Sequence, residues 1–392
     1  MQPEIKEISC PNCSSKQTKK HGTKKKKLQT LQRYFCSACK KTFTLQPDKN
    51  KTYTLKIILS ALSYYNLGHS QSESAKEISK RFKVKPSQKT ISNWLNEFKS
   101  ICTFSKLRNK AIKLHNPESI IHKQALSHIQ PYTFKYHKAK LHLLFHSKLY
   151  NNQFHNISHF YEPLKNYLQK ISTKEFPHHI FTYNKDIPSD DSRPIAEIER
   201  NLVDNNLKNE KSLNNQSNIG KRQIEQRASQ LKFEHLKIKY IKKQNQANIL
   251  AKLAINLATT NKQRHEAIQN FFLINDSTTI AVEAPIYLTN WDAGYYRNQH
   301  GFIFPLSNYA TPITGHIDIL QIRNGLLHIL DYKPDADKQI PIEQLTIYAL
   351  ALSRKLNLPL YHFKCAWFDE ANYFEFFPLH AVYEKQGKGL NS

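Results

Sequence analysis

Two aspartates in the last third of the sequence are spaced so that a short hairpin would bring them together. Asp318 and Asp331 flank Asn324-Gly325, the strongest short signal for a two-residue β-turn. In the register that this turn imposes, the two carboxylates lie directly opposite, with Cβ atoms about 5 Å apart. Like charges facing each other among apolar neighbours are unstable, and Mg²⁺ or Mn²⁺ would stabilise them. Lys333 points to the same face as Asp331 and could orient or help deprotonate a water that attacks a phosphodiester.

The elements that must position this hairpin follow from apolar periodicity and turn residues. A helix is expected over about 264–273, before the first strand, and a second over 341–356, after the hairpin. Strands are expected over 279–283, 317–322, 326–332, 361–368 and 373–377. The expected order is therefore helix, three strands, helix and two strands, with an aromatic-rich loop over 290–314.

The pattern Gly315-x-x-Asp318, Asp331-x-Lys333 and Gln344-x-x-x-Tyr348 resembles the PD-(D/E)xK nuclease superfamily, in particular its RecB-type branch. The resemblance covers about residues 260–380. It implies an α/β restriction-endonuclease-like αβββαβ domain in which Asp318 and Asp331 hold the metal. It further implies that Lys333 serves on the base side of catalysis and that Gln344 and Tyr348 lie near the substrate.

Two further site residues follow from the same resemblance. Glu283 is placed at the end of the first strand, where the family often supplies a carboxylate, and His265 on the preceding helix, where the RecB branch often has a histidine. A surface glutamate and a helix-face histidine are the alternatives. The long loop before Asp318 departs from the family. Its aromatic and basic residues could stack on unpaired bases or pack the domain: Trp291, Tyr295, Tyr296, Arg297 and His300.

Four of the six cysteines form two Cys-x-x-Cys pairs, Cys10/Cys13 and Cys36/Cys39. Four thiolates on two tight turns are typical of a structural zinc site, and a segment with so few apolar residues needs a metal to fold. A redox pair and incidental cysteines are the alternatives. The zinc reading predicts a ribbon over residues 1–48.

Basic residues fill the loop between the two cysteine pairs. They include Lys24, Lys25, Lys26, Lys27 and Arg33, which could contact phosphates. The arrangement of the cysteines around this loop, ending in Gln32-Arg33-Tyr34, resembles the N-terminal zinc ribbon of insertion-sequence transposases. In that family a helix-turn-helix follows the ribbon.

Residues 49–103 contain two short amphipathic helices of this kind, ending with one that begins after Ser87. Four polar residues remain on the exposed face of the last helix and could contact base edges or phosphates: Gln88, Lys89, Ser92 and Asn93. An ordinary helical hairpin is the alternative. Residues 104–260 are expected to be a helical middle region, with an Asn-rich linker around 184–218, and residues 261–392 the nuclease-like domain.

The charge distribution supports a multidomain chain with a nucleic-acid partner. The net charge is +27, and it is +15 in the first 100 residues but −2 in the last 132. Abundant lysine on solvated faces is the alternative explanation. The absence of a long apolar run, a leader or a disulfide framework predicts a cytoplasmic, prokaryote-like protein with no membrane contact, and a homodimer stays open.

The sequence therefore predicts a Mg²⁺-dependent DNA endonuclease or exonuclease, with structural zinc, associated with a mobile element or DNA processing. The alternative is a transposon-derived DNA-binding regulator whose nuclease-like domain no longer cuts. A complete transposase with a carboxylate triad fits poorly, because the spacing of Asp318 and Asp331 is that of a hairpin.

Overall fold

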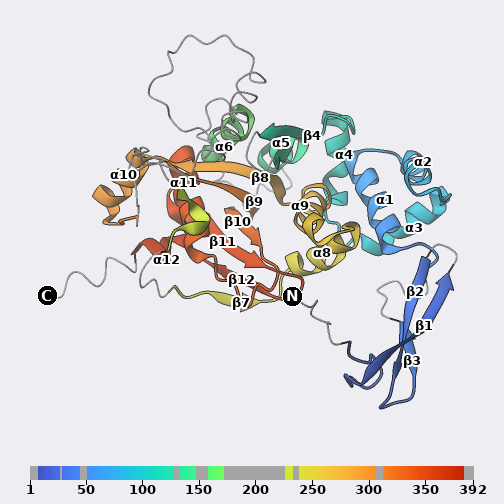
Figure 1. The fold of residues 1–392 in the computed structure, drawn as a ribbon. Coiled ribbons are helices and arrows are strands. Elements are labelled where there is room, and N and C mark those ends of the chain that lie inside the picture. Colours follow the sequence, from blue (N-terminus) through green and yellow to red (C-terminus); the bar gives the residue numbers. More distant parts are fainter. Residues whose placement is uncertain are drawn as a thin grey trace, which may run out of the picture.

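The computed structural model of this 392-residue chain describes residues 8–26, 29–44, 51–126, 132–146, 158–171, 226–232, 238–304 and 312–383. The chain is multidomain, with a small N-terminal sheet that carries four cysteines and a larger body of helices around a mixed sheet (Figure 1). None of the described helices has the length and apolar character needed to cross a bilayer.

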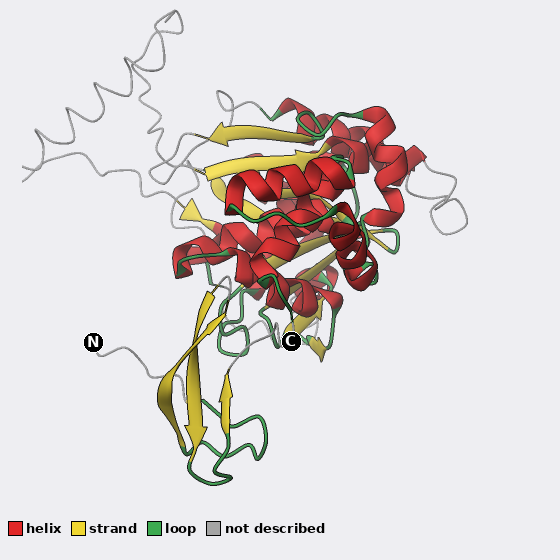
Figure 2. Cartoon of the chain, turned by 90° about the vertical axis from the view of Figure 1, so that its right-hand side faces the viewer, coloured by secondary structure: helices red, strands yellow, loops and turns green. Residues whose placement is uncertain are grey.

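The small sheet consists of three antiparallel strands that stand apart from the body in both views (Figures 1 and 2). They are β1 (Thr18–Lys26), β2 (Gln29–Cys36) and β3 (Thr42–Thr44). Tyr34 stacks on Phe43 with ring centroids 5.8 Å apart, and Phe43, Cys10 and Cys36 form a core of only a few side chains. So small a core needs a further source of stability.

Three helices follow: α1 (Leu55–Leu67), α2 (Gln71–Phe82) and α3 (Gln88–Phe98). Their ends are set by local chemistry, and the start of α3 after Ser87 is the one that the sequence predicts. Gly68 ends α1 with a φ of 124°, Ser70 and Glu73 form a capping box on α2, and the Ser87 hydroxyl accepts from the Thr90 N–H at the start of α3.

The main sheet has nine strands in the order β4-β5-β8-β9-β10-β11-β12-β7, with β6 paired to β9. The strands are β4 (Ile121–Leu126), β5 (Tyr132–His137), β6 (Gln226–Arg227), β7 (Ile241–Lys243), β8 (Thr279–Leu288), β9 (Ile313–Arg323), β10 (Leu326–Tyr332), β11 (Phe363–Phe368) and β12 (Tyr373–Phe376). Strands β10 and β11 are parallel, whereas β8, β9 and β10 form an antiparallel meander.

Helices cover both faces of this sheet (Figure 2). They are α4 (Ser105–Leu114), α5 (Lys138–His146), α6 (Ser158–Lys170), α8 (Gln246–Ala254), α9 (Arg264–Asn275), α10 (Asn290–His300), α11 (Ile342–Leu356) and α12 (Pro378–Tyr383). One core packs α6, α10 and α11 against the sheet, and a second core contains α8 and α9.

The second core also contains the buried residues of α1, α2 and α3. Ile58 and Leu59 of α1 belong to the same buried cluster as Phe272 of α9 and Tyr332 of β10. Helices α1–α3 and the carboxylate hairpin therefore share one apolar core. A buried hydrogen bond of 2.8 Å from Asn66 to Asn275 also joins α1 to α9.

The expectation of a helical middle region over 104–260 is wrong for several segments. Strands β4, β5, β6 and β7 all belong to the main sheet, and β5 pairs directly with β8. Aromatic residues at alternate positions, with Phe134 and Tyr136 buried, make β5 a strand despite its lysine and histidine content. The expected linker around 184–218 lies outside the described residues.

The expected loop over 290–314 is wrong in its first part, because residues 290–300 form helix α10. The Thr289 hydroxyl accepts from the Asp292 N–H, the Asp292 carboxylate accepts from the Thr289 N–H, and Gly301 ends the helix in the left-handed conformation. Strand β8 also continues to Leu288, so Glu283 lies inside the strand rather than at its end.

Candidate metal centres and carboxylate site

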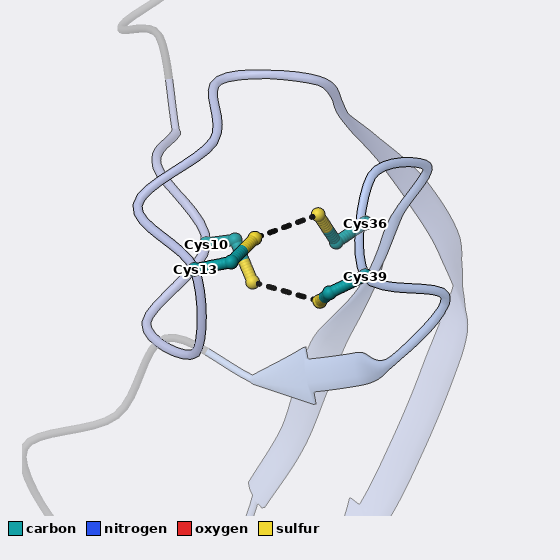
Figure 3. Close-up of side chains that lie close together, drawn as sticks. All are labelled: Cys10, Cys13, Cys36 and Cys39. Atoms are coloured by element: carbon teal, nitrogen blue, oxygen red, sulfur yellow. Dashed lines mark hydrogen bonds between the residues drawn. The ribbon is translucent and has the colours of Figure 1, made fainter.

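The four ribbon cysteines converge on one point. The Sγ atoms of Cys10 and Cys39 are 3.6 Å apart, as are those of Cys13 and Cys36 (Figure 3), and all four lie within 4.8 Å of one another. Tetrahedral zinc with bonds of about 2.3 Å places its sulfur ligands about 3.8 Å apart. The cluster can therefore hold a metal such as zinc.

Backbone N–H groups in the two turns favour the thiolate form that a metal requires. The Cys39 N–H lowers the pKa of the Cys36 thiol to about 6, and the Asn12 N–H donates to Cys10 Sγ at 3.4 Å. Within the described ranges, no other group of three or more Cys, His, Asp or Glu side chains brings its ligand atoms this close together.

The carboxylate hairpin has the predicted register. Asn324 and Gly325 both have positive φ, at 51° and 75°, and Leu326 pairs with Arg323. Ile319 pairs with Leu330, and Asp318 and Asp331 are the next residues along the two strands. The register that the turn predicts is thus confirmed up to the residues beside the acids, and the side chains of Asp318 and Asp331 interact with each other.

Glu283 extends the pair into a row of three acids across three strands. Val282 pairs with Ile319 and Ala284 pairs with Ile317, so Glu283 lies beside Asp318. Glu283 adopts a φ of 52°. This left-handed backbone conformation is strained for a non-glycine residue inside a strand. Backbone strain at a charged residue within such a row is typical of functional sites.

Cationic or amide side chains contact each member of the row. His265 Nε2 of α9 lies 2.5 Å from Asp318 Oδ2, and Lys333 Nζ lies 2.8 Å from Asp331 Oδ2. The Gln269 amide donates to Glu283 at 2.6 Å. The structure thus brings His265 and Lys333, two of the predicted residues, to the acids.

Burial makes this row electrostatically demanding. Burial and the nearby Asp318 charge raise the pKa of Asp331 well above its usual range, while burial raises the pKa of Glu283 to about 7, with Asp318 adding to it. Burial alone would raise the pKa of Asp318, but His265 outweighs it and the pKa is lowered. Asp318 in turn raises the pKa of His265 to about 9. The row therefore attracts cations.

Lys333 keeps its proton in this arrangement. Burial would lower the pKa of the ammonium group, but Asp331 and Asp318 raise it overall. A charged ammonium group suits the orienting role expected for Lys333 better than the role of proton acceptor.

Gln344 and Tyr348 lie together on α11. The Gln344 amide donates to the Tyr348 hydroxyl at 2.9 Å, and burial raises the pKa of Tyr348, with Asp331 adding to it. The two side chains meet on one face of the helix, as their spacing predicts.

The row offers the hard carboxylate oxygens that Mg²⁺ and Mn²⁺ prefer. Asp318 and Asp331 would hold the ion, with Glu283 beside them. The carboxylate oxygens of Glu283, Asp318 and Asp331 do not converge as closely as the four sulfur atoms of the cysteine cluster. Magnesium is commonly held by one or two carboxylates with water and substrate oxygens completing its shell, so the donor set fits the ion.

The recognition residues expected on α3 lie at the surface. Gln88, Lys89 and Asn93 are exposed, Ser92 is half-buried, and Ile91, Trp94 and Phe98 point into the core. Lys24 and Arg33 are exposed on β1 and β2, and the Arg33 side chain donates to the His21 carbonyl. Lys25 and Lys26 lie in β1, and Lys27 lies outside the described residues.

The sequence leaves open whether the aromatic residues of α10 pack the domain or are free to stack on unpaired bases, and they differ in burial. Tyr296 is buried and its hydroxyl donates to the Leu350 carbonyl, so it packs the domain. Trp291 is 89% exposed and Arg297 is also exposed. The Arg354 guanidinium lies over the Tyr295 ring, which also contacts His300.

Lys135 of β5 is a site residue that the sequence does not reveal. Its ammonium group contacts Glu266 at 3.3 Å and Asn270 at 2.9 Å on α9, and it acts electrostatically on Glu283. Glu266 follows His265, but Lys135 is more than a hundred residues away along the chain. No local spacing signals such a contact.

No family model, no curated protein and no solved structure matches the chain.

Proposed function

We propose that this protein is a DNA-binding nuclease that hydrolyses phosphodiester bonds with a divalent metal ion. The observation that carries the proposal is the row of Glu283, Asp318 and Asp331 across β8, β9 and β10, with Lys333 on Asp331. Buried like charges in register destabilise a fold, and a site for Mg²⁺ or Mn²⁺ explains why a chain would keep them. The resemblance to the RecB-type branch of the PD-(D/E)xK nucleases supports the same function.

The roles of the chain's own residues follow from their contacts. When bound, the ion would polarise the phosphodiester. Lys333, charged and held by Asp331, would orient the attacking water and offset negative charge on the phosphate. Gln344 and Tyr348 would bound the substrate on the α11 side.

DNA is the proposed substrate because two further features of the chain suit it. The exposed amide and ammonium groups of α3 can reach base edges and phosphates in a major groove. The lysine-rich strand β1 stands next to a cysteine cluster that could hold zinc. Both precede the carboxylate row in a chain of net charge +27.

A DNA-binding regulator that no longer cuts is the second candidate, and one contact favours it. His265 and the Tyr332 N–H both contact Asp318 Oδ2, so a cation already neutralises the acid that a metal would need. The metal must displace or share this contact for the row to be active.

The deciding experiment incubates purified protein with Mg²⁺ and linear, supercoiled or single-stranded DNA. Lys333→Ala should reduce cleavage by at least about 100-fold, which is the contribution expected of a charge-stabilising group. The matched control is Lys338→Ala, an exposed lysine five residues along, which should cut like the wild type. Equal cleavage by wild type and Lys333→Ala would remove Lys333 from the site. DNA binding without nicking of any form would favour the regulator.

A further inference from the structure

A cavity of about 440 Å³ lies between the helix-turn-helix segment and the helix that carries His265. Helices α1 and α2 contribute Lys56, Ser60 and Arg81 to its wall, and α9 contributes Glu266 and Asn270. Glu266 follows the residue that contacts Asp318. The cavity therefore lies between the two helices that precede α3 and the helix that carries His265.

The cavity wall is cationic. Lys56 and Arg81 form no ion pair with any residue in the described part of the chain, whereas Lys135 and Lys333 each contact an acid. The single acidic side chain of the wall is Glu266, and Lys135 already contacts it at 3.3 Å. No acid neutralises either charge, although the Arg81 guanidinium lies over the Phe82 ring, so both can receive an anion.

Polar side chains line part of the wall between these charges, and apolar ones such as Leu67, Leu257 and Ile274 line the rest. Ser60, Ser63 and Thr259 bring hydroxyl groups to the wall, and Gln263 and Asn270 bring amides. Hydroxyl, amide, lysine and arginine groups are the ones that bind DNA phosphates without reading sequence.

The walls of the cavity are fixed relative to the carboxylate row. The apolar residues beneath α1 belong to the same core as Phe271 of α9 and Tyr332 of β10. Phe271 itself lines the cavity. A strand bound there would be held at a constant distance from Asp318.

We propose that this cavity binds the phosphate backbone of DNA between the duplex held by α3 and the strand presented to the carboxylate row, with Lys56 and Arg81 as the phosphate contacts. The proposal deepens, and rests on, the proposed nuclease function. It implies that the two elements act on one DNA molecule at a set spacing.

The test measures binding of a labelled duplex by the full-length protein without magnesium, over a range of salt concentrations. Lys56→Ala and Arg81→Ala should each weaken binding about fivefold and lower the salt slope by about one counterion, and the double variant should lower it by about two. Lys56→Arg retains the charge and should bind like the wild type.

Lys76→Ala is the matched control, because this exposed lysine lies on α2 but does not line the cavity. Ala267→Leu provides a second approach, since it narrows the cavity from α9 without changing charge and should also weaken binding.

The proposal is overturned if the double variant binds with the affinity and salt slope of Lys76→Ala. It is also overturned if inorganic phosphate binds the wild type but not the double variant, while the two proteins bind DNA with equal affinity. The cavity would then hold a free anion and not the DNA backbone. Because binding is measured without cleavage, an inactive wild type that still depends on Lys56 and Arg81 for DNA would reject only the nuclease function.

Discussion

Tyr348 occupies the space that a side chain at residue 315 would need. A Cβ placed on Gly315 would lie 2.3 Å from Tyr348 Cε1, closer than real Cβ atoms come to any neighbour. The tyrosine ring of α11 therefore rests directly on the backbone of β9, three residues before Asp318. The glycine of the Gly-x-x-Asp pattern has a packing role that the sequence does not reveal.

Gly315→Ala should consequently displace Tyr348 and the Gln344 side chain that bonds to it. Overpacking of this kind costs about 1–3 kcal/mol of unfolding free energy. We expect a corresponding loss in urea denaturation and a fall in any metal-dependent cleavage. The matched control is Gly294→Ala on α10, where an added Cβ meets nothing within 4 Å.

A double variant separates the packing effect from a backbone effect. Tyr348→Leu removes the ring atoms that an alanine at 315 would strike, so combining it with Gly315→Ala should recover much of the lost stability. If the two losses simply add, the contact between residues 315 and 348 does not explain the glycine.

The features that the sequence predicts correctly are local ones. The Asn324-Gly325 turn fixes the hairpin register within a few residues, and the Ser87 side chain sets the start of α3. The convergence of the four cysteines likewise follows from two short turns.

What the sequence does not predict depends on distant parts of the chain. Lys135 reaches α9 only because β5 pairs with β8. An apolar residue such as Leu59 is predicted to be buried, but its sequence context does not indicate which helix packs against it. Helix α10 is not predicted because its sequence is rich in aromatic residues and its capping box has Asp292 where Glu is usual. Pairing between segments this far apart is not encoded in periodicity.

The cysteine cluster should bind one zinc ion per chain, and Cys36→Ser should lose it. The four thiolates supply the whole tetrahedron, so removing one leaves an open and weaker site. Metal content of the purified protein checks the stoichiometry. Cys102→Ala is the control, because Cys102 is buried in the core beneath α3 and should leave zinc binding unchanged.

Stability should fall on mild acidification through His328. Burial lowers the pKa of His328 to about 3, and the positive charges of Lys364, Arg323 and Lys243 add to this effect. Glu375 alone acts in the opposite direction. The unfolded chain therefore takes up a proton below about pH 6.5 while the folded chain does not, so stability present above that pH is lost as pH falls toward 3. At pH 5 the loss is about 2 kcal/mol.

Urea denaturation at pH 7 and pH 5 measures this effect. His328→Gln should lose less stability between the two pH values than the wild type, by about that amount. An identical pH dependence in the two proteins would show that His328 accepts a proton in the folded state.

Helices α1–α3 and the carboxylate sheet should unfold together, because they share one core. Trp94 on α3 and Trp367 on β11 report on the two parts, and replacing the exposed Trp291 together with one of these two by Phe leaves a single tryptophan. With Trp94 or Trp367 as the remaining tryptophan, fluorescence should give coincident denaturation curves.

Leu59→Ala, which deletes a fully buried side chain of α1, should shift both curves by about 3 kcal/mol. Phe43→Ala in the separate core of the small N-terminal sheet should shift neither. A Trp94 transition at lower urea than the Trp367 transition would mean that helices α1–α3 unfold by themselves, and the set spacing between α3 and Asp318 would then lose its physical basis.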